Sequence, residues 1–338
     1  MAGALSIALG AVKKAALTLG GTTDAKAQDL FLEARALGRS VDSAEAVRKV
    51  IALFDEAIGR DLNYGDAHLG KAGALDAYGG QFSKSPAETK EWTSRAEQSA
   101  RRAATLMPNS GGPAALLAQI STDQLEYRSA LKGLNQALST YPNDTYVCAA
   151  ALNALPYLVQ DASALALADR SISLDPFNPN AYVSRGLCLY FLRRFEDAIG
   201  ATKRAVALAP SRNYPKYRIS DSLIMLNRAD EAHAVLAKLS VDDVIRQTDE
   251  AIIAARLGDH AGAETWMAKL RAANGDSASY QYAQINAQLG DIDGAFAALN
   301  KGIEALDPGM ISLKRDPFLD PIRKDPRYVA LLIRLDFP

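Results

Sequence analysis

Alanine-rich stretches with an amphipathic pattern recur along the chain, and the clearest of them run into a proline. Residues 205–210 show the arrangement, with Ala-Val-Ala-Leu-Ala followed by Pro210. Because proline cannot continue the hydrogen-bond ladder of a helix, the pattern predicts helices that end at these prolines. Such prolines stand at positions 108, 142, 176 and 210, each 34 residues after the one before. The chain is therefore built from a repeated helical unit.

A fixed period of 34 residues with two helices per unit is typical of tetratricopeptide (TPR) repeats. The sequence thus predicts an all-α fold, a right-handed TPR superhelix (α-solenoid) of about eight helix pairs, with a short capping helix over 328–335. A solenoid also explains how 338 residues fold without one large core, since each repeat packs on its neighbours. The expected units are 23–62, 66–108, 111–142, 145–176, 179–210, 213–240, 244–272 and 276–308, preceded by an N-terminal amphipathic helix or linker (1–22) and followed by the tail and cap (309–338).

The unit 179–210 shows why the spacing matters. Gly186 and Ala198 fall where the two helices of the unit cross, so small side chains let the backbones approach. Tyr182, Leu189 and Phe195 are expected to fill the seam between the helices. Small and large residues therefore alternate as a packed helix pair requires.

Three segments depart from the regular repeat. The first unit is expected to pair helices over 25–38 and 44–60. In the second unit a helix over 67–78 is expected to end in a loop over 79–86, because Gly79, Gly80 and Pro86 are strong helix breakers. Pro156, inside the first helix of the fourth unit, is expected to bend or shorten that helix.

Composition narrows the function classes. The formal net charge is −1, so bulk electrostatics gives no reason to expect nucleic acid or an acidic membrane as partner. Cys148 and Cys188 both fall in first helices and are expected to be free thiols, which fits a reducing compartment. No stretch is long and apolar enough to span a bilayer. Lys13 and Lys14 follow the apolar N-terminal run instead of preceding it, the wrong polarity for an export signal, so a cytoplasmic location is expected.

Motifs that carry catalysis are missing from the sequence. It has no glycine-rich phosphate loop, no cysteine or histidine pair at metal-ligand spacing and no nucleophile elbow. We therefore expect a protein that is not an enzyme and has neither a cofactor nor a bound metal. The acidic residues at 242, 243, 249 and 250 suggest either acid–base chemistry or acids that complement a helix dipole at a helix start, and the second reading is favoured.

The concave groove is the main candidate site. In a TPR array the first helix of every unit lines this groove, which is wide enough for a peptide. Tyrosines interleaved with amides and one arginine suit an extended peptide or a small polar ligand. The residues expected to line the groove are Asn153, Tyr157, Asn180, Ser184, Tyr190, Phe191, Tyr214, Tyr217, Arg218, Asp221, Tyr280 and Gln284. The sequence predicts a protein or peptide partner and leaves the oligomeric state open.

The last fifty residues carry a more specific pattern. Leu-Gly-Asp at 289–291 precedes Asp-Pro-Gly at 307–309 and the stretch LKRDPFLDPIRKDPRY at 313–328. This tail resembles the end of bacterial multidomain regulators in which adenylate or guanylate cyclase domains, or winged-helix domains of the ToxR/CadC type, precede a TPR array. Residues 24–32 resemble the place where those arrays begin. The resemblance implies regulation by binding in bacterial signalling or transcription and supplies no active site.

Two hypotheses from different classes follow. The first is a non-catalytic TPR scaffold that binds a protein or peptide in its groove. The alternative is a small-ligand sensor module for a cyclase or a transcription factor, which the tail resemblance favours.

Overall fold

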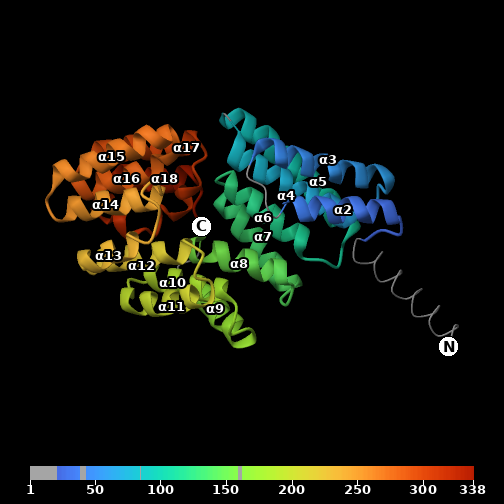
Figure 1. Ribbon diagram of the computed structural model, residues 1–338, viewed down its shortest axis with the longest axis horizontal. Coiled ribbons are helices and arrows are strands. Elements are labelled where there is room, and N and C mark those ends of the chain that lie inside the picture. Colours follow the sequence, from blue (N-terminus) through green and yellow to red (C-terminus); the bar gives the residue numbers. More distant parts are fainter. Residues whose placement is uncertain (1–20, 39–42, 84, 159–161) are drawn as a thin grey trace. The chain divides into compact units, whose positions relative to one another are not determined.

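A computed structural model describes residues 21–38, 43–83, 85–158 and 162–338 (Figure 1). The expected N-terminal helix lies outside these residues. The chain divides into two compact units, the first with residues up to Gln124 and Ser129–Ala150, the second with Leu125–Arg128 and Ala151–Pro338.

The helices follow one another in packed pairs. The first unit holds α2 (Ala25–Gly38), α3 (Ala44–Arg60), α4 (Gly65–Phe82), α5 (Pro86–Leu106), α6 (Gly112–Asp123) and most of α7 (Tyr127–Thr140). Helix α8 (Thr145–Leu158) begins in the first unit and ends in the second. The second unit continues with α9 (Ser163–Leu174), α10 (Pro179–Phe191), α11 (Phe195–Leu208), α12 (Tyr214–Met225), α13 (Ala229–Leu236), α14 (Val244–Arg256), α15 (His260–Asn274), α16 (Ser279–Leu289), α17 (Ile292–Glu304) and α18 (Pro326–Arg334).

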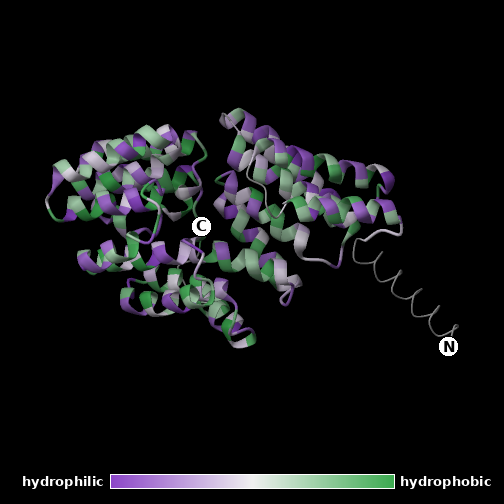
Figure 2. Cartoon of the chain, in the orientation of Figure 1, coloured by the Kyte–Doolittle hydropathy of each residue, from purple (hydrophilic) through white to green (hydrophobic). Residues whose placement is uncertain are grey.

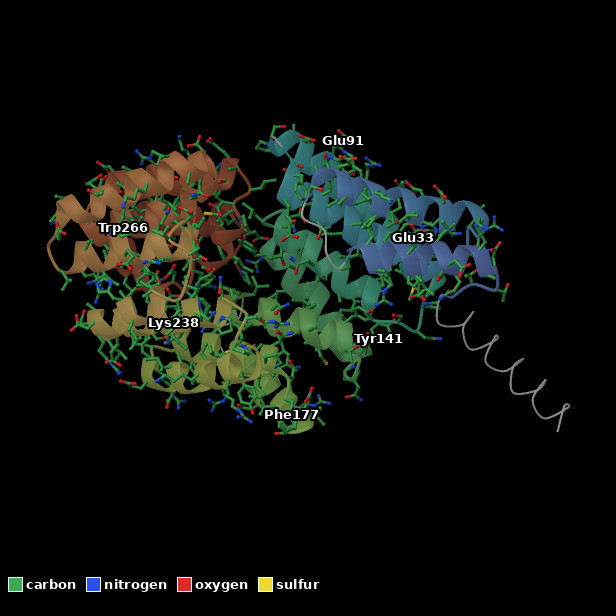
Figure 3. All side chains as sticks on the ribbon, in the orientation of Figure 1. Glu33, Glu91, Tyr141, Phe177, Lys238 and Trp266 are labelled. Atoms are coloured by element: carbon green, nitrogen blue, oxygen red, sulfur yellow. The ribbon has the colours of Figure 1, made fainter. Side chains whose placement is uncertain are left out.

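The expected fold class is confirmed. Over the described residues α2 to α17 form eight consecutive pairs, α18 follows them, and no strand occurs. Polar and apolar residues alternate around the helices, as Figure 2 shows, so each helix can bury one face. Large apolar side chains also stand at some turns, where Phe177 points into solvent with 73% of its surface exposed (Figure 3).

Short-range chemistry sets the helix ends. Ser43 accepts a hydrogen bond from the backbone N–H of Ala46 and so caps α3. Between α16 and α17, Gly290 has φ of 81°, a left-handed conformation that glycine adopts without strain. The next residue, Asp291, accepts from the N–H of Gly294 and caps α17. The Leu-Gly-Asp pattern is therefore a compact turn between two helices.

The seam of the pair α10–α11 confirms the role of its small residues. A Cβ at Gly186 would lie 2.2 Å from Thr202 Oγ1 and 3.3 Å from the carbonyl oxygen of Ala198. No side chain fits there, so glycine sets the distance between the helices.

The loop expected over 79–86 is wrong. Helix α4 continues through Gly79 and Gly80 to Phe82, and α5 begins at Pro86 behind the cap Ser85. A Cβ at Gly79 would lie only 3.2 Å from Trp92 Cβ of α5, so this glycine permits close helix packing and does not break the helix. The extra residues of this repeat thus lengthen both helices.

Pro156 neither ends nor visibly shortens its helix. It lies in the last turn of α8, which runs to Leu158. Its carbonyl group accepts a hydrogen bond from the guanidinium of Arg315, far along the chain. Arg315 belongs to the segment after the last helix pair, which the repeat pattern does not describe.

Candidate functional site

The segment after the last repeat packs into the second unit. It forms two short 3-10 helices, η2 (Pro308–Ser312) and η3 (Pro317–Ile322), and the side chains of Phe318 and Leu319 in η3 are almost completely buried. Helix η3 packs against α16. Arg315 lies between the two short helices, bonded to the carbonyl of Pro156 in α8, with its guanidinium 5.0 Å from the ring centroid of Phe191 in α10. The tail is therefore part of the core of this unit.

Asp316 ties the tail to α16. Its Oδ2 accepts hydrogen bonds from the Tyr280 hydroxyl at 2.8 Å and from Gln284 Nε2 at 2.7 Å. Its other oxygen accepts from the N–H of Phe318 at 2.9 Å and so starts η3. Tyr280 and Gln284, expected to line a groove open to a partner, hold the chain's own tail instead. Their part of the groove is filled.

An open recess lies further along the first helices of the pairs. Its volume is about 300 Å³. A larger cavity of about 480 Å³ lies elsewhere in the same unit. Helices α8, α10 and α12 surround this recess. Its lining residues are Leu152, Asn153, Val183, Ser184, Leu187 and Tyr214. Three of the residues expected from the sequence, at 153, 184 and 214, are thus brought together.

Two tyrosines form one side of this region. The hydroxyl oxygens of Tyr157 and Tyr214 lie 2.7 Å apart, which links α8 to α12. Burial raises the pKa of Tyr157 well above its usual range, so its hydroxyl stays neutral. Its ring meets Phe191 edge-on, with centroids 5.3 Å apart. Tyr214 stays 41% exposed, so an incoming ligand can reach its side chain.

Arg218 lies behind Tyr214, enclosed by aromatic rings. Its guanidinium carbon is 5.5 Å from the ring centroid of Tyr190 and 5.8 Å from that of Tyr214. Its Nη2 lies 2.6 Å from Asp221 Oδ2, and both side chains are largely buried. This ion pair cancels the charge of the arginine locally.

Several buried polar atoms of this cluster have no hydrogen-bond partner within the described residues. They are Ser184 Oγ, Tyr190 Oη and Arg218 Nε. Such atoms normally find a protein or water partner, because leaving one unpaired costs about 1–3 kcal/mol. Ser184 also lines the recess. The recess therefore offers unused hydrogen-bonding capacity at its wall.

Asp249 of α14 completes the cluster, and the sequence reading of this residue is wrong. Asp243 does cap the start of α14, accepting from the N–H groups of Ile245 and Arg246. Asp249, one turn further on, is instead buried and hydrogen-bonded to Asp221. A signal was available, because Asp249 precedes Ile252 and Ile253 at the three- and four-residue spacing of a buried face.

Burial dominates the electrostatics of the two carboxyl groups. It raises the pKa of Asp221 to about 6, against the opposing effect of Arg218. Burial, together with the charge of Asp221, raises the pKa of Asp249 well above its usual range. Burial thus favours the protonated form of Asp249, whereas Asp221 is the partner of Arg218.

The remaining predicted residues serve the framework. The Tyr217 hydroxyl donates to Asp243 Oδ2 at 2.6 Å and so supports the cap of α14. Asn180 is exposed, and its Oδ1 accepts from Arg212 Nη1 at 2.6 Å. Both cysteines are free thiols, and burial raises the pKa of Cys188 to about 12.

Neither metal chemistry nor membrane insertion is visible in the part of the chain that the structure describes. Within it no group of three or more metal-ligating side chains comes together. Every helix there is also too short or too polar to cross a bilayer.

Solved structures share the fold at low sequence identity. Human IFIT1, in a dimer with m7Gppp-AAAA, is 15% identical, with a TM-score of 0.61 over 92% of this chain and 72% of that chain. Yeast Tom70 is 17% identical, with a TM-score of 0.52 over 92% of this chain and 68% of that chain. Both are TPR-type proteins, so the chain has a TPR-like fold. No protein-family model matches the chain, and no curated protein does either.

Proposed function

We propose that the protein is a non-catalytic scaffold that binds an extended peptide segment of a protein partner at the recess between α8, α10 and α12. The proposal rests on one observation, the open recess of about 300 Å³ with the exposed ring of Tyr214 at its edge. Such a volume suits one or two side chains of a peptide, with Leu152, Val183 and Leu187 providing the apolar surface.

The polar rim fits a peptide backbone. Asn153 lines the recess and is exposed, and its amide carries both a donor and an acceptor. A peptide group presents the complementary pair. Ser184, whose hydroxyl is unused, adds a further contact inside the recess.

A nucleic acid fits the recess less well. The IFIT1 structure holds m7Gppp-AAAA, which makes RNA the natural competing occupant. Phosphate groups need cations that are free to pair with them. The arginine behind this recess is already neutralised by Asp221 at 2.6 Å.

We further propose that this scaffold acts in the cytoplasm in bacterial signalling or transcriptional regulation, and the tail resemblance supports the regulatory role. A second function is favoured by a separate observation. Two buried polar atoms, Tyr190 Oη and Arg218 Nε, have no hydrogen-bond partner within the described residues, and a small polar ligand could supply one. In that case the protein is a sensor module for a cyclase or a transcription factor.

Selection from a displayed random-peptide library, followed by affinity measurement, tests the leading function. Tyr214→Ala should weaken selected peptides by about thirtyfold, since truncating a central aromatic costs about 2 kcal/mol. Tyr146→Ala, which removes another exposed tyrosine outside the recess, is the matched control and should change little.

Two outcomes would overturn the proposal. Selected peptides that bind Tyr214→Ala as well as the wild type would place binding elsewhere. Tight binding of capped oligoadenylate that Tyr214→Ala abolishes would make the recess an RNA site.

A further inference from the structure

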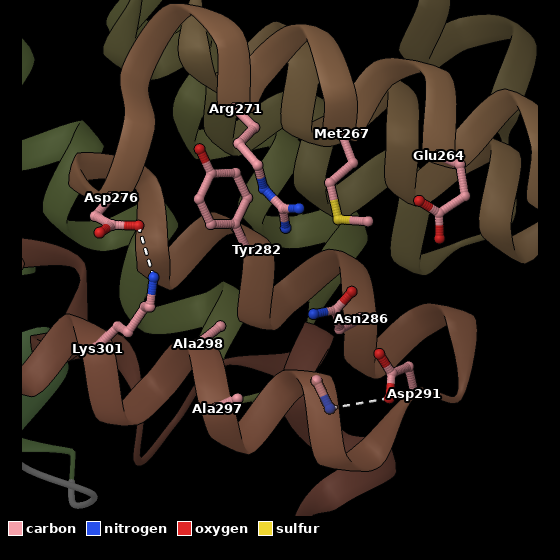
Figure 4. Close-up of a pocket in the computed structure, with 11 residues that line it drawn as sticks. Glu264, Met267, Arg271, Asp276, Tyr282, Asn286, Asp291, Ala297, Ala298 and Lys301 are labelled. Atoms are coloured by element: carbon pink, nitrogen blue, oxygen red, sulfur yellow. Dashed lines mark hydrogen bonds and ion pairs between the residues drawn. The ribbon is translucent and has the colours of Figure 1, made fainter.

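A second cavity lies among the last three helices of the array. Helices α15 and α17 form its walls and α16 its floor, as Figure 4 shows, and its volume is about 480 Å³. The small side chains of Ala297 and Ala298 keep the α17 wall low. The volume lies within the range of ligand pockets, roughly 300–1,000 Å³.

Asn286 stands in the middle of the floor and points into the cavity (Figure 4). Its side chain is 7% exposed, and its amide has no hydrogen-bond partner among the described residues. A Cβ at Gly294 would lie 2.9 Å from Asn286 Nδ2, so the glycine leaves room for this amide. A buried amide normally uses both its donor and its acceptor. Here both are left for a ligand.

One end of the cavity is positively charged. The guanidinium of Arg271 lies 5.1 Å from the ring centroid of Tyr282, a stacked position that leaves its N–H groups available. Lys301 lines the same cavity, and its Nζ is 2.9 Å from Asp276 Oδ1, so this second cation is already paired (Figure 4). Arg271 therefore supplies the net charge at this end.

The opposite end is negatively charged. Glu264 lies on the same helix as Arg271, seven residues earlier, and Asp291 faces it from the start of α17 (Figure 4). Asp291 Oδ1 accepts the Gly294 N–H at 2.9 Å as a helix cap. The cavity is thus bipolar along its length.

The separation of the two ends sets the size of the ligand. Seven residues of helix rise about 10 Å, which separates the Cα atoms of Glu264 and Arg271. An extended two-residue chain spans about 7 Å between its ends. The side chains of Glu264 and Arg271 extend into the cavity and make up the remaining distance. A free dipeptide also has one peptide group midway between its charged ends, where it can contact the amide of Asn286.

We propose that this cavity binds a short zwitterion of dipeptide type, with its carboxylate at Arg271, its ammonium group at Glu264 and Asp291, and its peptide group on Asn286. The site is independent of the recess between α8, α10 and α12. A soluble metabolite could therefore bind between α15, α16 and α17 while a partner occupies the recess between α8, α10 and α12.

Calorimetric titration with a panel of free dipeptides, from alanylalanine to members with apolar and charged side chains, tests the site. Each dipeptide is compared with its N-acetylated and its C-amidated form. We expect saturable binding of a free dipeptide, weakened roughly tenfold or more by either block, because each removes a charge-assisted hydrogen bond.

Variants assign the two ends. Arg271→Gln should weaken the free dipeptide but should not weaken the C-amidated form further, and Glu264→Gln should do the same for the N-acetylated form. Asn286→Leu should weaken all forms. Lys269→Gln removes a cation of the same helix that stacks on Trp266 outside the cavity, and it should bind like the wild type.

Circular dichroism melting of each variant separates loss of binding from loss of folding. Arg271 and Glu264 are exposed, so their variants keep the fold and the test does not depend on Asn286→Leu alone. Absence of saturable binding across the panel at millimolar concentration would overturn the proposal. Equal weakening by Arg271→Gln and Lys269→Gln would do so too.

Discussion

Each unit holds a pair of carboxyl groups between the first helices of neighbouring helix pairs. The pair in the first unit is half-buried and the pair in the second unit is buried, and their surroundings differ. In the first unit Asp76 of α4 is hydrogen-bonded to Asp123 of α6, and burial together with the second carboxyl raises the pKa of Asp76 to about 8. In the second unit Asp249 stands against Asp221, and Asp221 is paired with Arg218. A cation therefore keeps one acid of the second pair ionised near neutral pH.

We propose that the two pairs differ in role, the first supporting the fold and the second belonging to the candidate site. In the first unit the raised pKa of Asp76 favours its protonated form, which is hydrogen-bonded to Asp123, and Gln119 Nε2 also donates to Asp123 at 2.9 Å. The pair in the second unit belongs to a larger cluster that reaches the open recess through Tyr214. A cation paired with one of the buried acids, and an open recess beside the cluster, are what distinguish the candidate site.

The tail is the second difference between the units. Truncating Phe318, which buries the tail in the second unit, should have the largest effect on the free energy of unfolding. Phe318→Ala should lower the free energy of unfolding by about 3–5 kcal/mol, because a fully buried aromatic is replaced by a cavity. Phe54→Ala in α3 of the first unit is the matched variant, with the same chemistry and similar burial.

Hydrogen exchange locates the two losses. Phe318→Ala should expose amides of η3 and α16, and Phe54→Ala those of α2 to α4. A loss below 1 kcal/mol for Phe318→Ala would contradict the view that the tail belongs to the core.

Removing the buried cation should have an intermediate effect that depends on pH. Arg218→Met leaves the carboxylate of Asp221 without its partner, which should cost about 3 kcal/mol at pH 8. At pH 5 the loss should be smaller, because Asp221 then takes up a proton. Urea unfolding at the two pH values measures the difference.

Arg256→Met is the control for this prediction. Arg256 is exposed and hydrogen-bonded to Gln288 and Asn227, so its loss should be small and similar at both pH values. Equal destabilisation of Arg218→Met at pH 5 and pH 8 would show that Asp221 does not depend on this cation.

The smallest effect is expected in the first unit. The raised pKa of Asp76 means that the folded chain holds a proton that the unfolded chain releases above about pH 4. The stability of this unit should therefore fall as the pH rises from about 4 to about 8. Asp76→Asn, which mimics the protonated acid, should remove the fall and stabilise the protein by on the order of 2 kcal/mol at pH 8, since the partly exposed site is screened.

Thermal melting of Asp76→Asn across this pH range measures the slope, with the exposed Asp29→Asn as control. An unchanged slope would show that the pair in the first unit does not hold a proton at neutral pH.

Much of the helical framework was predictable from sequence. The bounds 25–38 and 44–60 agree with α2 and α3, because the amphipathic period and the helix caps are local signals. The error at Gly79 has the opposite origin. Glycine breaks a helix by its local preference, and only the contact with α5 shows why it is retained there.

The candidate site was predictable in part. Asn153, Ser184 and Tyr214 come together at the recess as the repeat register suggested. Tyr280 and Gln284 share that register, yet both donate hydrogen bonds to Asp316 of the tail. Asp249 was assigned to a helix start, although its spacing to Ile252 placed it on the buried face.

The sequence by itself determined the repeat, the number of helix pairs and the face that each helix buries, because these follow from periodic local interactions. The tertiary structure alone decided what fills the groove. Segment 308–322 lies outside the repeat period. Its position against α8 and α10 depends on contacts between residues more than a hundred positions apart, such as Arg315 with Pro156. Which polar atoms remain unpaired, and therefore where a ligand finds partners, follows from that packing.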